Sequence, residues 1–174
     1  RPWLPESLAL TGRAHGQVAL EFAQGVLTGQ ASWVQEETRL SSVGDEEELT
    51  TGFDTVRLDL EFTPDEAQAR FMLAGEAGLR LSGEGRAEAP LGALSPVEGR
   101  LTAHLPDIAL FVPLLADSAG LADVAGEVGL DIVVAGSLGE PRITGSAQLS
   151  GGAAALTGIG VSIEDIEVDV LGDG

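Results

Sequence analysis

The sequence of 174 residues predicts an all-β fold, and three of its properties lead to this prediction. Apolar and polar residues alternate with a period of two over most of the chain, which is typical of strands with one apolar face. Helix signals are almost absent. Glycine supplies 24 residues, about twice its average share of roughly 7 %, and it occurs inside the alternating segments as well as between them. Glycine within a strand permits sharp bending and close backbone approach, so bent strands are expected.

The alternating segments predict the strands in chain order. In the first, Leu8–Phe22, apolar residues, glycine and alanine share one parity, and polar residues hold most of the other. Thr63–Asp65 contains a proline and predicts a turn. At Glu164–Asp165 the apolar parity changes, which indicates a β-bulge at that pair. The predicted strands cover residues 8–22, 56–62, 69–83, 97–105, 128–134, 143–149 and 161–170.

One segment departs from this alternation. Between Pro106 and Leu121, the apolar residues Ile108 and Phe111 recur at helical spacing, while Pro113 limits the length of any helix. We therefore expect at most one short helix, or an irregular apolar plug, near residues 106–121.

The charge and composition exclude several classes of function. The net charge is -19, from 9 basic and 28 acidic residues, and the chain contains no lysine, cysteine, tyrosine or asparagine. Phosphate backbones and anionic headgroups would repel so acidic a chain, which argues against a nucleic-acid partner. Thiolate metal sites, disulfides and lysine chemistry are excluded because their atoms are missing. A hydrophobic ligand would have to be held by apolar contacts.

No residue pattern indicates catalysis, a metal or a cofactor. His15 and His104 fall at polar positions of predicted strands and have no nearby ligand spacing. The acidic run Asp45–Glu48 lacks the alternating aspartates and glycine of a calcium loop, so an exposed loop is favoured. Nucleophile elbows, zinc-protease motifs and dinucleotide fingerprints are also absent. The sequence therefore predicts a protein that is not an enzyme, with no catalytic or metal-binding residues and no cofactor.

Residues 1–174 are interpreted as a single β-rich segment. The longest uncharged apolar run, Ile108–Ala116, is too short to span a bilayer, for which roughly 18 residues are needed. The last residues, Leu171–Gly174, are typical of a hairpin turn that a further strand would follow. We therefore expect the segment to belong to a longer protein.

The apolar face of such strands needs a cover, and the residues leave its identity open. A second packed sheet, closure into a barrel, or a bound apolar partner would each serve. Aromatic residues make up only 4 % of the chain, and many positions on the apolar parity are glycine or alanine, which leaves room for a groove. Leucine, isoleucine and valine are nevertheless numerous enough to fill a modest sandwich.

Residues 126–174 carry a more specific pattern. A strand ends in a Gly-x-Leu-x-x-Pro turn at Gly136–Pro141, and the next strand places Gly145 two residues after Ile143. A Gly-x-Gly at residues 158–160 and an aliphatic-acidic strand follow. This pattern resembles the C-terminal region of the TamB family, AsmA-like proteins that form the inner-membrane subunit of the translocation and assembly module. The earlier half resembles the family in style, through Pro-Trp-Leu-Pro at residues 2–5 and long alternating strands.

The resemblance implies both a shape and a role. TamB-like proteins form a long curled sheet with a U-shaped apolar trough, a β-taco. The family is linked to outer-membrane protein assembly with an outer-membrane barrel partner of the TamA type, and to phospholipid movement between the two membranes. The implied location is the periplasm, with an inner-membrane anchor in another part of the protein. The implied cargo is phospholipid acyl chains or unfolded outer-membrane protein strands.

We expect the trough to be lined by the large apolar residues that share one parity within each strand. The opposite parity, with Arg57, Asp59 and Glu61 on one strand, should form the outer face. The alternative is a strand-rich structural spacer or adhesin-like domain with a closed core and no lipid cargo. The expected lining residues are Val56, Leu58, Leu60, Phe62, Phe71, Leu73, Leu79, Leu81, Leu101, Val128, Leu130, Ile132, Ile143 and Leu149.

Overall fold

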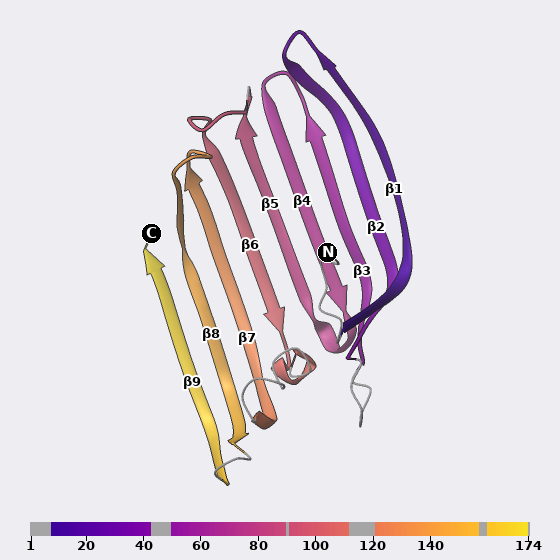
Figure 1. Ribbon diagram of the computed structural model, residues 1–174. Coiled ribbons are helices and arrows are strands. Elements are labelled where there is room, and N and C mark those ends of the chain that lie inside the picture. Colours follow the sequence, from indigo (N-terminus) through magenta and orange to yellow (C-terminus); the bar gives the residue numbers. More distant parts are fainter. Residues whose placement is uncertain (1–7, 43–49, 90, 112–120, 157–159, 174) are drawn as a thin grey trace.

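The computed structural model describes residues 8–42, 50–89, 91–111, 121–156 and 160–173, and within them the chain forms one 9-stranded sheet (Figure 1). Every strand pairs antiparallel with the strands before and after it in the sequence. The strands are β1 (Leu8–Ala23), β2 (Val26–Ser42), β3 (Thr50–Phe62), β4 (Glu66–Gly75), β5 (Arg80–Glu88), β6 (Val97–Leu105), β7 (Leu121–Gly136), β8 (Pro141–Leu156) and β9 (Val161–Asp173).

The sheet is open. Strands β1 and β9 lie at opposite margins in Figure 1, and β1 and β2 bend strongly along their length. Helical structure among the described residues is confined to the short 3-10 turns η1 (Glu76–Gly78) and η2 (Ile108–Phe111). The expected all-β fold with a long curled sheet is therefore confirmed, and η2 lies where the short helix was expected.

The strands differ from the sequence prediction in their bounds and in their number. Strand β3 begins at Thr50 and not at residue 56, β7 begins at Leu121 and not at residue 128, and β8 ends at Leu156 and not at residue 149. Strand β2 was not predicted, because glycine, alanine and glutamine occupy many of its positions on the apolar parity. The predicted strand 69–83 is in fact two strands, β4 and β5, joined by η1. The chain reverses there because Ala77 and Gly78 have φ of 55° and 90°, and the Gly75 N–H donates to the Leu79 carbonyl oxygen at 2.9 Å.

Short turns hold the meander together. Gln24 and Gly25 join β1 to β2 with φ of 53° and 83°, the positive values that a two-residue type I′ hairpin turn requires. The predicted turn at Thr63–Asp65 is confirmed, since the Thr63 N–H donates to the Glu66 carbonyl oxygen at 2.8 Å. Gly136, with φ of 102°, begins the β7–β8 turn.

The register of the strands aligns apolar residues on one face of the sheet. Directly paired residues of an antiparallel sheet point to the same side. One row of pairs runs from Val56 through Leu73, Leu81, Ala103, Leu130 and Ala147 to Val170. We call the side that contains this row the apolar face, and the other side the polar face.

Bulges preserve this separation where the sequence parity changes. The predicted bulge at Glu164–Asp165 is confirmed: Asp165 has φ of 55°, and β9 advances by one extra residue between its pairs with Gly152 and Ala154. A similar register shift on β2 surrounds Glu37, which has φ of 52°. The β9 bulge keeps Ile163 and Ile166, on its two sides, on the apolar face.

The described residues contain very little conventional core. Leu79 and Ala87, at 2 % and 9 % exposure, are the buried hydrophobic residues. The other large residues of the apolar face are half-buried or exposed, and no second sheet among the described residues covers them. Backbone ladders and contacts between neighbouring strands therefore supply most of the cohesion.

Gly29 provides a test of the β1–β2 register. Its φ is 122°, and a Cβ atom there would lie 2.0 Å from the Ala19 carbonyl oxygen. We expect Gly29→Ala to lower the free energy of unfolding by roughly 2 to 4 kcal/mol, because the backbone must shift or the strands separate. Gly172→Ala is the control, since a Cβ atom there meets nothing within 4 Å. Urea unfolding of both variants would measure the difference, and equal midpoints would contradict the register.

Candidate functional site

The apolar face brings the predicted lining residues together across β3 to β8. Val56, Leu73, Leu81 and Leu130 lie in one cross-strand row. The next row contains Leu58, Phe71, Leu101 and Ile132. A third row begins at Leu60 and ends at Ile143. Phe62 lies in a fourth row. Val128 of β7 pairs with Leu149 of β8.

Most of these side chains are partly open to solvent. Ile143 is 53 % exposed, and the remainder, apart from Leu79, are half-buried. Leu79 differs because it follows η1 at the end of the sheet, where neighbours cover it almost completely. Leu79 therefore anchors the β4–β5 turn, while the other predicted residues form an accessible aliphatic surface.

The sequence reasoning omitted several residues of this face. Trp33 pairs with Leu58 and is 39 % exposed, which makes it the largest side chain among the described residues of the apolar face. On β1, Val18 and Phe22 are exposed by 72 % and 74 %. Val134 extends the row between Gly99 and Ile143. The alternation of β1 contained the signal for Val18 and Phe22, whereas Trp33 was missed because β2 was not recognised.

Polar side chains interrupt the apolar face on β2. Gln35 pairs with Val56, and Thr38 pairs with Phe53 three residues further along β2. Both are buried, and the Thr38 Oγ1 atom has no hydrogen-bond partner. Gly12 of β1 lies close to Gln35 and Thr38. A Cβ atom at Gly12 would lie 3.1 Å from the nearest atom of each of these two side chains. The continuous aliphatic surface therefore begins at β3.

Glycines leave part of the apolar face without side chains. Gly85 of β5 pairs directly with Gly99 of β6, and Gly83 lies two residues before Gly85 on the same face. A Cβ atom at Gly85 would have only ordinary contacts, the nearest at 3.5 Å. The backbone itself is therefore the surface at this point, between the side chains of Phe71 and Val134 in the neighbouring strands.

The polar face carries ion pairs within and between strands. Arg57 bonds Asp59 at 2.6 Å, Arg86 bonds Glu98 at 2.6 Å, and Arg100 bonds Asp131 at 2.5 Å. The hydrogen bond from Arg57 holds the pKa of Asp59 below its ordinary value, and the hydrogen bond from Arg100 does the same for the pKa of Asp131. All these groups are exposed, so each pair adds little stability.

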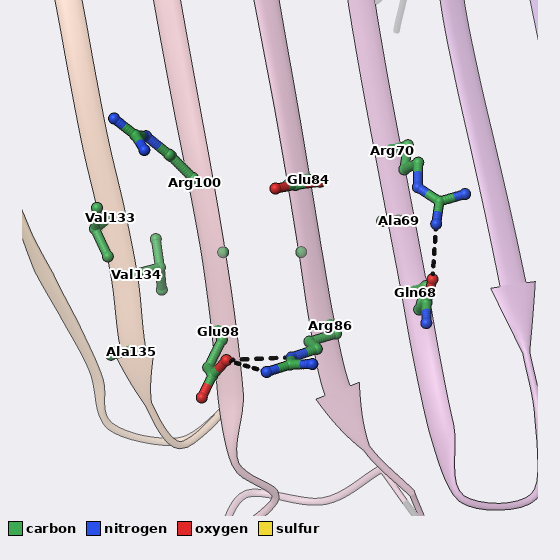
Figure 2. Close-up of a pocket in the computed structure, with 12 residues that line it drawn as sticks. Gln68, Ala69, Arg70, Glu84, Arg86, Glu98, Arg100, Val133, Val134 and Ala135 are labelled. Atoms are coloured by element: carbon green, nitrogen blue, oxygen red, sulfur yellow. Dashed lines mark hydrogen bonds and ion pairs between the residues drawn. The ribbon is translucent and has the colours of Figure 1, made fainter.

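Shallow hollows accompany these charges. One of about 510 Å³ is lined mainly by polar-face residues of β4 to β7, including Arg70, Glu84 and Arg100. Figure 2 shows Arg86 reaching across to Glu98, whereas Arg70 turns to Gln68 on its own strand. The lining carries three arginines and two glutamates, and two of the arginines are paired, Arg86 with Glu98 and Arg100 with Asp131.

The two histidines lie on separate strands of the sheet, His15 on β1 and His104 on β6. His104 Nδ1 lies 3.5 Å from Glu127 Oε1 on the polar face, and His15 is exposed on β1. Within the described ranges, no group of histidine and acidic residues is arranged to hold a metal ion. Asp45–Glu48 lies outside the described residues.

Comparison with known proteins identifies the family. A search of curated proteins and a search of solved structures each give no match. None of the helices in the described parts of the chain is long and apolar enough to cross a membrane. The family model for the TamB N-terminal domain matches residues 1–149. The sequence pattern in residues 126–174 resembles the C-terminal region of the same family. The family model and the sequence pattern therefore indicate the same family but different regions of it. The match covers most of the sequence, and the chain belongs to the TamB family.

Proposed function

We propose that this chain is a non-enzymatic hydrophobic-groove module of a periplasm-spanning TamB-like protein. Its apolar face holds phospholipid acyl chains or unfolded outer-membrane protein strands. The complete protein, with a barrel partner of the TamA type, then supports outer-membrane protein assembly, phospholipid transfer between the inner and outer membranes, or both. Residues 1–174 form one β-rich segment of that protein, and another part anchors it in the inner membrane.

The cross-strand register is the observation that carries this proposal. It lines up aliphatic side chains from β3 to β8, and the half-buried Ile166 and the exposed Val168 of β9 extend them. Because no other described element seals this surface, a cargo molecule has access to it. An apolar surface of this extent is typical of an interaction site rather than of an inert exterior.

The chemistry of the lining suits cargo that slides. Aliphatic side chains make no directional hydrogen bonds, so an acyl chain would be held by desolvation and dispersion, at about 0.8 kcal/mol for each buried methylene group. Equivalent side chains follow one another along the strands and across them. A chain can therefore move from one contact to the next without breaking a specific bond.

Both kinds of cargo would use the same surface. An outer-membrane strand in its unfolded state has aliphatic side chains at alternate positions, and these would contact the apolar face as an acyl chain does. The acidic polar face faces away from the cargo and keeps the module soluble in water. A closed spacer without cargo is the alternative, and the two experiments below distinguish it from a groove.

A charge placed on the apolar face should block cargo binding. In Leu60→Arg or Ile132→Glu, an ion would occupy the surface that an apolar tail must cover, and desolvating it costs several kcal/mol. We expect each variant to bind a fluorescent phospholipid at least roughly tenfold more weakly than the parent protein. The matched control is Glu61→Arg, next to Leu60 on the polar face, which should bind normally. Circular dichroism would verify the fold, and unchanged binding by folded Leu60→Arg would favour the closed spacer.

Crosslinking in cells tests which face the cargo contacts. A photoreactive amino acid at position 60 or 132 lies on the apolar face, while positions 61 and 133 lie on the polar face of the same strands. We expect capture of lipid or outer-membrane protein from 60 and 132 only. Mass spectrometry of the adducts would also separate lipid cargo from protein cargo. Equal capture from both faces would argue against a groove.

A further inference from the structure

Trp33 places a hydrogen-bond donor in the open on the apolar face. Among the strand side chains that the structure describes on this face, polar groups occur only on β2, at Trp33, Gln35 and Thr38. Gln35 and Thr38 are buried, at 9 % and 3 % exposure, so a cargo molecule cannot reach them. Trp33 is 39 % exposed, and its indole N–H has no hydrogen-bond partner in the described parts of the chain.

The two strands beside Trp33 give it different neighbours. Strand β2 lies between β1 and β3, and Trp33 pairs with Gly16 on one side and with Leu58 on the other. A Cβ atom at Gly16 would lie 3.5 Å from Cδ1 of Trp33. One side of the indole therefore adjoins backbone without a side chain, and the other side adjoins the continuous aliphatic surface.

The cross-strand row that begins at Trp33 carries no further side-chain donor among the described residues. It runs through Leu58, Phe71 and Leu101 to Ile132 of β7. The five strand spacings from β2 to β7, at about 4.8 Å each, give a length of roughly 24 Å. The tails of one leaflet occupy half of a hydrocarbon core that is roughly 30 Å thick. The row is therefore long enough to hold one extended acyl tail.

This arrangement sets a hydrogen-bonding requirement for the cargo. Hydrocarbon over Trp33 would remove water from the indole N–H and leave it unsatisfied, which is costly. The part of a cargo that covers Trp33 therefore needs an acceptor, while the part that covers the rest of the row needs none. A diacyl phospholipid has this pattern, because its ester carbonyl groups lie at one end of its tails. A polypeptide strand fits less well, because its backbone has polar groups at every residue.

We propose that Trp33 binds the ester end of a phospholipid. The indole N–H donates to an ester carbonyl oxygen, and one tail extends from there across the sheet toward Ile132. The headgroup lies on the Gly16 side of the indole. This inference rests on the proposed function, because it requires lipid on the apolar face, and it adds the orientation of that lipid. Indole rings occupy the same boundary between hydrocarbon and polar groups in membranes.

Fluorescence quenching by brominated lipids tests the orientation. The chain has two tryptophans, so Trp3→Phe leaves Trp33 as the only one. Phosphatidylcholine with bromine near the ester, at mid-chain or near the methyl end of its tails is loaded from vesicles, and the complex is then separated from the vesicles by size exclusion. We expect quenching of Trp33 to be strongest with bromine near the ester and to fall toward the methyl end.

A second fluorophore at the far end of the row is the matched control. Ile132→Trp, added to the Trp3→Phe protein, should contribute emission that bromine near the methyl end quenches most. The same order of quenching at both positions, or strongest quenching of Trp33 from the methyl end, would overturn the proposed orientation. Absence of quenching at both positions would show that the lipid does not occupy the apolar face, and the proposed function would then fail as well.

Lipid chemistry tests the hydrogen bond itself. A diether phosphatidylcholine has the same head and tails as the diester but lacks the carbonyl oxygens. We expect the parent protein to bind the diester at least roughly threefold more tightly, as one neutral hydrogen bond predicts. Benzothienylalanine in place of Trp33 keeps the ring shape but exchanges the N–H for sulfur, and should erase this preference, as should Trp33→Phe. Phe71→Leu changes an aromatic ring in the same row that has no donor, and should keep the preference.

The outcomes separate this inference from the proposed function. Equal binding of both lipids by the parent protein would overturn the role of Trp33 but not lipid binding by the apolar face. A preference for the diester that survives benzothienylalanine would place the carbonyl contact elsewhere and would also overturn it. Circular dichroism would verify the fold of each variant. Undiminished binding of both lipids by folded Leu60→Arg would instead count against the proposed function.

Discussion

The antiparallel register is the constraint on which the rest of this structure depends. Side chains alternate between the faces of a strand, so a slip of one residue would move every aliphatic side chain of that strand to the polar face. Here the rows through Val56 and Leu58 cross the sheet without such a slip. With only Leu79 and Ala87 buried among the described hydrophobic residues, no packed core exists to correct a misaligned strand. Pairing and side-chain alternation must therefore agree strand by strand.

Irregular residues make this agreement possible. Asp165 and Glu37 have positive φ and absorb one residue each, and around Asp165 this keeps Ile163 and Ile166 on one face. Gly29 also helps to keep β1 and β2 in register. Because it has no side chain, β2 can lie against the Ala19 carbonyl group of β1. The polar face adapts more easily, since its ion pairs are exposed and can exchange partners in water.

Much of the fold and part of the candidate site could be predicted from the sequence. Strict alternation identified most strands, the bulge at Glu164–Asp165 and the shared parity of the expected lining, because these depend on local spacing. Strand β2 was missed because Gly29, Ala31 and Gln35 weaken its apolar signal. The burial of Thr38 and the coverage of Leu79 depend on which residues the neighbouring strands place beside them, and a single alternating segment contains no such information.

The meander has a consequence for how proteins of this design can change in size. Each strand touches mainly the strands directly before and after it, so its local environment is set by its nearest neighbours. Structures with this property behave as linear arrays in which units can be gained or lost at little cost to the others. Insertion of one hairpin would widen the sheet by two strand spacings of about 4.8 Å each, while both faces keep their character. The reach of such a sheet can therefore be adjusted in evolution by duplication or deletion of hairpins, without redesign of a central core.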